Sequence, residues 1–272
     1  DYASSIQETI DGGYVFTGST GSGDYNEAWL MKTNSQGNED WNQTFGGGNY
    51  DRGNSVQQTN DGGYIITGEI SSSGNGSSDV LLIKTDHNGN KEWKRTFGGD
   101  DYDRGYSVQQ TRDGGFIIVG STQSNGDSYN DVWLIKADSQ GNEEWNRTFG
   151  GGYVDIGHCV YETTDNGYVI TGYTQSYGNG SRDLWLIKTD SRGNEEWNRT
   201  FGDSFVDFGN SVQQTIDGGY IITGSKGTDY HSDVWLIKTD AQGNEEWNRM
   251  FGGVDYDFGN FVQQTNDNGY II

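Results

Sequence analysis

Five tryptophans recur along the chain at intervals of 52, 52, 52 and 50 residues, each inside a near-copy of one segment. Each copy reads, with few changes, DGGYIITG, a Ser- and Gly-rich stretch, DVWLIKTDSQGNEEWNRTFGG and DYDRGNSVQQT. A period of about 50 residues, built from short apolar runs and turn residues, is typical of propeller blades. The repeat therefore predicts one continuous domain over residues 1–272. The five tryptophans are Trp41, Trp93, Trp145, Trp197 and Trp247.

The third copy shows how one repeat divides into strands. Four segments rich in strand-forming residues, separated by Gly- and Asp-rich turns, are residues 107–111, 116–119, 132–136 and 145–149. Apart from the lysine that ends the third, the two middle segments are continuous apolar runs, which is typical of strands covered on both faces. No segment has helical periodicity, so other sheets must provide that cover. This predicts an all-β propeller of four-stranded antiparallel blades stacked face to face.

The same division gives five complete blades and two strands of a sixth. The blades are expected at about residues 5–50, 55–98, 107–150, 159–202, 211–252 and, in part, 261–272. The chain begins inside a repeat and stops within a strand, so we expect it to be a piece of a longer polypeptide. A native ring of six or more blades and a five-bladed ring with surplus strands are both open alternatives.

The chain is strongly acidic, with 17 basic and 40 acidic residues and a formal net charge of −23. Such a field repels phosphate backbones and anionic lipids, so we expect no nucleic-acid partner and no direct membrane insertion. No segment has the roughly 20 apolar residues of a membrane span. Cys159 is the single cysteine, which excludes an intrachain disulfide. It replaces the serine of other copies and is expected to fill a small core position.

One lysine and one aspartate recur in every copy. The lysine ends the third strand, and a buried ammonium needs a carboxylate partner. The aspartate opens the Asp-x-Gly turn before each first strand, so we expect structural Lys–Asp pairs within or between blades. A catalytic role is disfavoured because an active site usually breaks such symmetry. The residues are Lys32, Lys84, Lys136, Lys188 and Lys238, and Asp51, Asp103, Asp155, Asp207 and Asp257.

The segments GYIITGST and DVWLIKTDSQGNEEWNRTFGG, together with the Asp-x-Gly turn, resemble the SBBP repeat. That family is a β-propeller repeat of bacterial and archaeal cell-surface and secreted proteins, and the resemblance covers essentially the whole chain. It implies an extracellular, cell-surface location, commonly as one module of a multidomain protein, and it implies no reaction. The turn and tryptophan are also similar, to a lesser degree, to the docking motif of quinoprotein propellers.

The links between the second and third strands are the variable part of each copy. They read GSGDYNEA, SSSGNGSSD, QSNGDSYND, QSYGNGSRD and KGTDYHSD. Varied loops on a rigid scaffold are where recognition usually resides, whereas the alternative interpretation is unconstrained drift. The acidic turns at 99–103 and 255–257 carry oxygen ligands of the kind Ca²⁺ takes, but EF-hand spacing is absent. Capping of turns is the preferred interpretation, and no cofactor is expected.

Five asparagines stand in glycosylation sequons, which predicts a glycoprotein. Three lie on the fourth strands and two in the variable links: Asn42, Asn146 and Asn198, and Asn75 and Asn179.

No catalytic constellation is apparent. The histidines, His87, His158 and His231, occupy three unrelated repeat positions, which disfavours a metal site or a triad. We therefore expect a non-enzymatic extracellular module with a structural or adhesive role in a prokaryotic surface assembly. Its partners would be surface proteins, glycans or neighbouring domains of the same chain. The alternative is a carbohydrate-binding, carbohydrate-active or quinoprotein-like propeller that uses its central channel.

Overall fold

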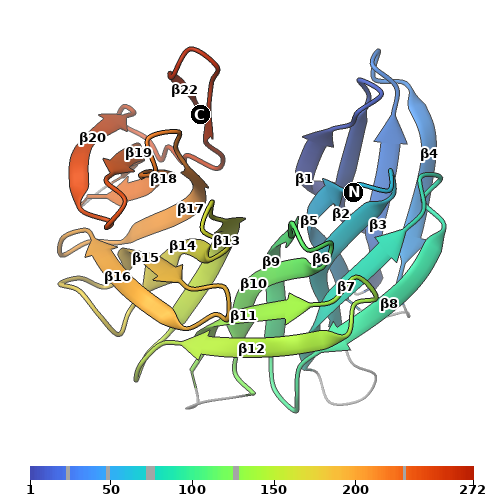
Figure 1. Cartoon of the computed structure of the whole chain (residues 1–272), viewed down its shortest axis with the longest axis horizontal. Coiled ribbons are helices and arrows are strands. Elements are labelled where there is room, and N and C mark those ends of the chain that lie inside the picture. Colours follow the sequence, from blue (N-terminus) through green and yellow to red (C-terminus); the bar gives the residue numbers. More distant parts are fainter. Residues whose placement is uncertain (23–24, 47–49, 72–76, 125–128, 229–230) are drawn as a thin grey trace. The chain divides into compact units, whose positions relative to one another are not determined.

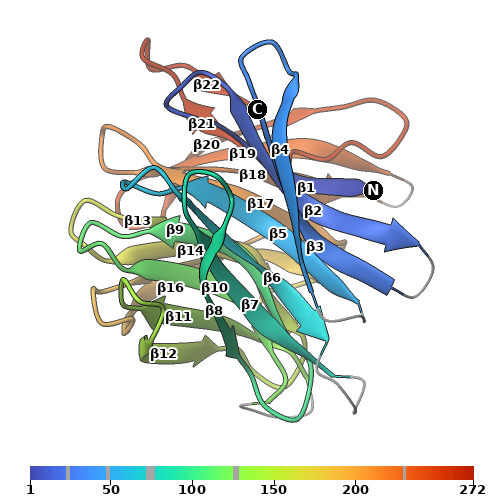
Figure 2. The same cartoon turned by 90° about the vertical axis from the view of Figure 1, so that its right-hand side faces the viewer.

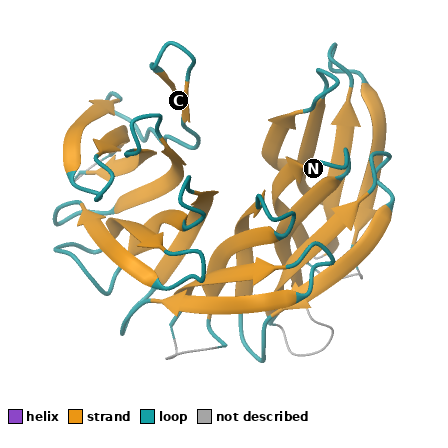
Figure 3. Cartoon of the chain, in the orientation of Figure 1, coloured by secondary structure: helices purple, strands orange, loops and turns teal. Residues whose placement is uncertain are grey.

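The computed structural model describes residues 1–272 except 23–24, 47–49, 72–76, 125–128 and 229–230. Within the described residues every regular element is a β-strand, and none is a helix (Figure 3). This part of the chain therefore contains no helix of the length and apolarity needed to cross a bilayer. Its strands form five four-stranded antiparallel sheets and one two-stranded sheet.

The chain comprises two compact units, and each is described by itself. The first contains residues 1–126 and 135–146, and the second contains residues 127–134 and 147–272. The division passes through the third sheet, which consists of β9 (Asp103–Gln110), β10 (Phe116–Thr122), β11 (Asp131–Ala137) and β12 (Glu143–Phe149).

The first unit contains the first and second sheets, in which strands pair in sequence order (Figures 1 and 2). The first sheet is β1 (Tyr2–Glu8), β2 (Tyr14–Ser22), β3 (Tyr25–Thr33) and β4 (Glu39–Phe45). The second is β5 (Asp51–Gln58), β6 (Tyr64–Ser71), β7 (Ser78–Thr85) and β8 (Lys91–Phe97).

The second unit contains the fourth and fifth sheets and a short hairpin. The fourth sheet is β13 (Asp155–Glu162), β14 (Tyr168–Thr174), β15 (Asp183–Thr189) and β16 (Glu195–Phe201). The fifth is β17 (Asp207–Gln214), β18 (Tyr220–Gly227), β19 (Ser232–Thr239) and β20 (Glu245–Phe251). The hairpin is β21 (Gln263–Gln264) and β22 (Tyr270–Ile271).

The predicted all-β fold, with five complete four-stranded sheets and two further strands, is confirmed. The first strands begin earlier than expected: β9 starts at Asp103 rather than at Ser107. The reason is a β-bulge, which shifts the register against β10 and lets the pairing continue beyond it. The Asp-x-Gly segment predicted as a turn is thus the first part of the strand.

The bulge also directs a side chain toward the next sheet. In β13 the register shifts between Gly157 and Cys159, so His158 is the extra residue. Its Nδ1 lies 3.0 Å from the carbonyl oxygen of Gly209 in β17. Bulged asparagines donate a hydrogen bond to the matching carbonyl elsewhere: Asn54 to Gly105 and Asn210 to Gly259.

A recurring turn closes the first hairpin of each sheet. In the third sheet the amide of Gly114 donates to the carbonyl of Thr111 at 2.9 Å, and Gly114 has a φ of 84°. Glycine adopts this conformation without a Cβ clash. The Asp113 carboxylate accepts hydrogen bonds from the Thr111 hydroxyl and from the amide of Gly115, so the turn is capped internally.

Neighbouring sheets pack through their second and third strands. The first and second sheets share one apolar cluster, in which Leu30, Ile66 and Ile83 are at most 1% exposed. The fourth and fifth sheets share an equivalent cluster that includes Leu186 and Ile222. The middle strands are therefore covered on both faces, which explains why their sequences are apolar without alternation.

The repeated tryptophans lie half-buried on the fourth strands and complete this packing. Trp41 meets Tyr64 of the next sheet edge to face, with ring centroids 5.7 Å apart. A Cβ added to Gly89, in the last turn of that sheet, would lie 2.5 Å from the Trp41 ring. The same arrangement recurs for Trp93 with Phe116 and Gly141, and for Trp197 with Tyr220 and Gly243.

The close approach of the first and second strands gives a test of the packing. A Cβ on Gly120 would lie 1.8 Å from the carbonyl oxygen of Arg104, a backbone atom that no rotamer change can move. We expect Gly120→Ala to lower the free energy of unfolding by about 1–3 kcal/mol, measured by chemical denaturation. Gly152→Ala is the matched control, because no atom lies within 4 Å of its added Cβ. Equal losses in the two variants would contradict this explanation.

Candidate functional site

The repeated lysine is the centre of a structural cluster. Each ammonium is buried, with the side chain 3–5% exposed, and pairs with the aspartate of the first hairpin turn at 2.9–3.0 Å. It also lies near an acid on the fourth strand and donates to the carbonyl of the residue that follows it. The turn acids are Asp11, Asp61, Asp113, Asp165 and Asp217, and the fourth-strand acids are Asp40, Glu92, Glu144, Glu196 and Glu246.

These partners differ from the predicted ones, which were Asp51, Asp103, Asp155, Asp207 and Asp257. The antiparallel register explains the difference. Lys188 pairs with Val169, next to the hairpin turn, whereas Asp155 pairs with Thr174 at the other end of the same sheet. A lysine at the end of the third strand therefore reaches the turn acid and not the acid that opens the first strand.

The five aspartates predicted to pair with the lysines lie at or before the first strands. Carboxylates of this set accept hydrogen bonds from the segments that connect consecutive sheets. Asp103 Oδ2 accepts hydrogen bonds from the amide of Gly99 at 3.0 Å and from the Ser124 hydroxyl at 2.7 Å. Asp257 Oδ2 likewise accepts the amide of Gly253 at 3.1 Å. These contacts are the ones that the turn-capping interpretation expects. Among the described residues no group of three His, Cys, Asp or Glu side chains is placed to hold a metal ion.

The sequon asparagines have different surroundings. Asn42 and Asn179 are exposed. Asn146 and Asn198 are half-buried, and each donates from Nδ2 to a glutamate of its own strand at 2.6 Å. Asn75 lies outside the described residues.

The histidine and cysteine positions have structural explanations. Burial lowers the pKa of His158, whose ring takes the place of the bulged asparagine in other sheets. The cysteine, Cys159, is half-buried and packs against the apolar cluster shared by the fourth and fifth sheets, which agrees with the expected small core position.

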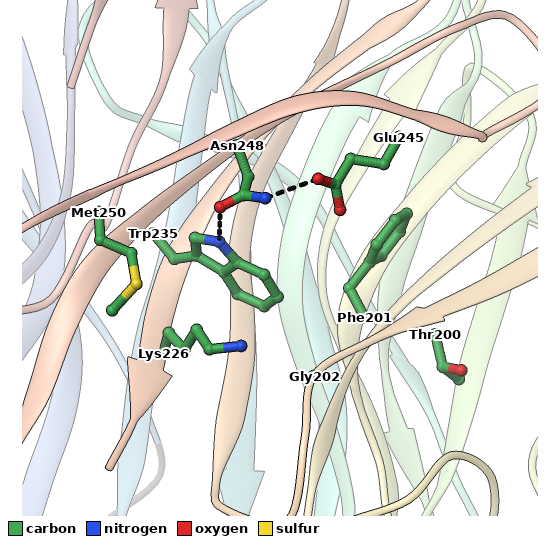
Figure 4. Close-up of a pocket in the computed structure, with 8 residues that line it drawn as sticks. All are labelled: Thr200, Phe201, Gly202, Lys226, Trp235, Glu245, Asn248 and Met250. Carbon is green, nitrogen blue, oxygen red and sulfur yellow. Dashed lines mark hydrogen bonds between the residues drawn. The ribbon is translucent and has the colours of Figure 1, made fainter.

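A cavity of about 410 Å³ opens at the fifth sheet, where it meets the end of β16 (Figure 4). The indole Nε1 of Trp235 donates to Asn248 Oδ1 at 3.3 Å, and Asn248 Nδ2 donates to Glu245 Oε1 at 2.6 Å. Lys226 Nζ lies 4.6 Å from the ring centroid of Trp235. The lining residues are Thr200, Phe201, Gly202, Lys226, Trp235, Glu245, Asn248 and Met250.

An ion pair borders this cavity. Lys226 Nζ lies 3.1 Å from Asp203 Oδ2, and both side chains retain contact with solvent. Partial burial alone would raise the pKa of Asp203, but the hydrogen bond and charge of Lys226 hold it below its ordinary value. The cavity therefore presents a fixed cation, an aromatic face, an amide and the carboxylate of Glu245.

Two lining residues depart from the repeat, and this makes the cavity the candidate functional site. Lys226 stands where the second, third and fourth sheets have Ile70, Thr122 and Thr174. Met250 replaces the threonine of the other four copies. Sequence reasoning missed this site because it concentrated on residues that repeat. The signal was present in these two single substitutions within otherwise repeated strands.

The variable links, for which the sequence left recognition and unconstrained drift as alternatives, are described only in part. Residues 23–24, 72–76, 125–128 and 229–230 of four links lie outside the described residues. The fourth link is described throughout. In it, Tyr177 lies against Trp185, with ring centroids 5.4 Å apart.

No family model matches the sequence, and no curated protein matches it. Solved structures share its fold. Sqt1 from Chaetomium thermophilum aligns with 97% of this chain at a TM-score of 0.57 and 10% identity. The WD40 domain of Pan2 from Neurospora crassa aligns with 96% of this chain and 68% of its own length, at a TM-score of 0.56 and 9% identity. The chain spans 64% of the length of Sqt1.

These likenesses support a propeller repeat fold in general, and the five sheets are its blades. The SBBP repeat itself is not confirmed, since no family model matches.

The prediction that the chain is not an enzyme is contradicted by another neighbour. An ulvan lyase of polysaccharide lyase family PL25 aligns with 92% of this chain and 70% of its own length, at a TM-score of 0.57 and 10% identity. The fold is thus shared by interaction domains and by a carbohydrate-active protein. A regular repeat does not exclude catalysis, because function resides in sites carried by a fold.

The ion pairs around the buried lysines predict how the free energy of unfolding changes at acidic pH. The hydrogen bond from Thr215, assisted by Lys238, lowers the pKa of Asp217 from 3.8 to about 2. Because the folded state holds the lower pKa, this stabilisation is complete above about pH 4 and is lost as the pH falls toward 2. We expect the difference in unfolding free energy between the wild type and Asp217→Asn to shrink over that interval.

The measurement is chemical denaturation at intervals from pH 6 to pH 2. Asp255→Asn, which removes the same charge at an exposed position, is the control. A difference between wild type and Asp217→Asn that stays constant with pH would refute the proposed coupling.

Proposed function

We propose that this chain is a recognition module that binds a protein partner at the cavity on its fifth sheet. The observation that carries the proposal is the coincidence of a cavity with departures from the repeat. Lys226 and Met250 interrupt strands that are otherwise copied five times, and both line the same space. Substitutions without functional selection would be distributed over the exposed surface and would not gather at one cavity.

The fold neighbours support this choice of partner. Sqt1 has been solved in complex with the N-terminus of ribosomal protein L10, and that structure aligns with this chain at a TM-score of 0.51 and 10% identity. The cavity also has the composition of a peptide site, since Trp235 and Met250 offer apolar surface while Lys226 and Glu245 offer both charges.

A second candidate function is recognition or cleavage of an acidic polysaccharide. The ulvan lyase neighbour was solved with -[GlcA(1-4)Rha3S]- bound. The ammonium of Lys226 beside the Trp235 ring would suit an anionic sugar, with Glu245 and Asn248 available for hydroxyl groups.

We further propose that the module works outside the cell as part of a surface assembly. The net charge of −23 keeps a large β-surface soluble and repels anionic lipid. The exposed sequon residues Asn42 and Asn179 would be accessible to glycosylation.

The experiment compares the wild type with a variant in which the cavity is returned to the repeat, Lys226→Thr with Met250→Thr. Both proteins are screened against a displayed random-peptide library and an array that includes uronic-acid polysaccharides. We expect peptide ligands whose affinity falls at least about tenfold in the double variant, because about 1.4 kcal/mol of contact is removed.

The matched control is His87→Ser, which returns an exposed turn of the second sheet to the repeat sequence. It should bind as the wild type does. Ligands that bind the double variant equally well would overturn the proposed site, and polysaccharide ligands alone would favour the second candidate.

A further inference from the structure

In the fourth sheet, a tyrosine covers the position that corresponds to the cavity on the fifth, with 46% of its surface still exposed. The link of the fourth sheet places the ring of Tyr177 against Trp185, at a centroid distance of 5.4 Å and an interplanar angle of 44°. The Tyr177 hydroxyl donates to the carbonyl oxygen of Gly150 at 2.7 Å. We call this arrangement of Trp185, Gly150 and Glu195 around the ring the tyrosine seat.

The electrostatics of the seat suit a neutral phenol. Burial, followed by the nearby charges of Asp155, Glu195 and Asp131, raises the pKa of Tyr177. A tyrosine hydroxyl already keeps its proton at neutral pH, and this shift extends its role as a hydrogen-bond donor to more alkaline pH. Its acceptor is a backbone carbonyl, whose position does not depend on the side chains of the repeat.

The cavity of the fifth sheet is built from the counterparts of these residues. Trp235 corresponds to Trp185 in the register of the third strands, since they pair with Gly224 and Gly172 respectively. Gly202, Glu245 and Asn248 stand at the repeat positions of Gly150, Glu195 and Asn198, and all three line the cavity. Each indole also donates to the asparagine of its own fourth strand.

The links differ between the two sheets. The fourth link runs over residues 175–182, whereas the fifth is shorter, at residues 228–231. No residue between 227 and 232 is among those that line the cavity in the described part of the chain. The described residues of this link, Thr228 and His231, therefore do not cover the cavity as Tyr177 covers Trp185 in the fourth sheet.

Two residues at or beside the cavity of the fifth sheet differ from those at the same repeat positions in the fourth sheet. Lys226 takes the position of Thr174, and Asp203 takes that of Gly151. Their ion pair holds the ammonium over the Trp235 ring. An aromatic ring entering the cavity would therefore meet a cation as well as an indole, and cation–π attraction favours such a ring.

We infer that the cavity of the fifth sheet receives a tyrosine side chain presented by the partner protein, with its hydroxyl donating to the carbonyl oxygen of Gly202. This inference rests on the proposed function, because it names what occupies the same site. Phenylalanine would fill the space but leave that carbonyl without a donor, so the site selects tyrosine over phenylalanine.

The test uses N-acetyl-tyrosinamide and N-acetyl-phenylalaninamide as probes, titrated into the whole chain and followed by the indole N–H signals in NMR. We expect saturable shifts of the Trp235 signal with the tyrosine amide, and binding of the phenylalanine amide at least about fivefold weaker. Equal binding of the two amides, or no binding, would overturn the inference.

Two variants test whether the tyrosine amide binds at the position of Trp185 or at that of Trp235. Tyr177→Ala empties the fourth seat and should add a second binding event, seen at the Trp185 signal. Lys226→Thr with Met250→Thr should weaken only the event at Trp235. If Tyr177→Ala gains a site while Trp235 still gives no response, the fifth sheet does not act as an open seat and the inference fails.

The fifth link contains its own tyrosine, Tyr230, which lies outside the described residues. The variant Tyr230→Ala decides whether the chain supplies the ring itself. Binding of the tyrosine amide only in this variant would make the seat intramolecular and would overturn the assignment to a partner. Failure of the proposed function is distinguishable, because it would appear as ligands insensitive to the double variant while the tyrosine amide still binds at Trp235.

Discussion

Face-to-face packing of sheets is the constraint on which the rest of the structure depends. The second and third strands are apolar on both faces, so a single sheet cannot bury its own surface and needs a neighbour on each side. Fully buried residues such as Leu30, Ile66, Leu186 and Ile222 lie in clusters shared by two sheets. The half-buried tryptophans extend this contact to the fourth strands, and the bulged asparagines extend it to the first.

This constraint is readable in the sequence, which is why strand number, strand order and fold class were predictable. The apolar middle strands, the Asp-Gly turns and the tryptophan period each follow from local chemistry. The partner of the buried lysine was not predictable in the same way. Its choice depends on which end of the sheet the side chain reaches, and that follows from the register of Lys188 with Val169 rather than from spacing along the chain.

The candidate site was harder to predict for a related reason. The sequence comparison concentrated on residues that recur in every copy, whereas this cavity is distinguished by two lining residues that do not recur, Lys226 and Met250. Whether such a change fills or opens a space depends on the link that crosses it, as Tyr177 demonstrates in the fourth sheet. The fourth and fifth sheets thus present the same position, and the residues of the link and of the strand ends determine how it is lined.

Hydrogen exchange in the second unit tests the central role of sheet packing most directly. Gly224→Ala places a Cβ 1.8 Å from the carbonyl oxygen of Phe208 and so destabilises the fifth sheet. If neighbouring sheets depend on each other, the amides of β14 and β15 in the fourth sheet will exchange faster in parallel with those of β18 and β19. Unchanged exchange in the fourth sheet would contradict this dependence and show that each sheet is stable by itself.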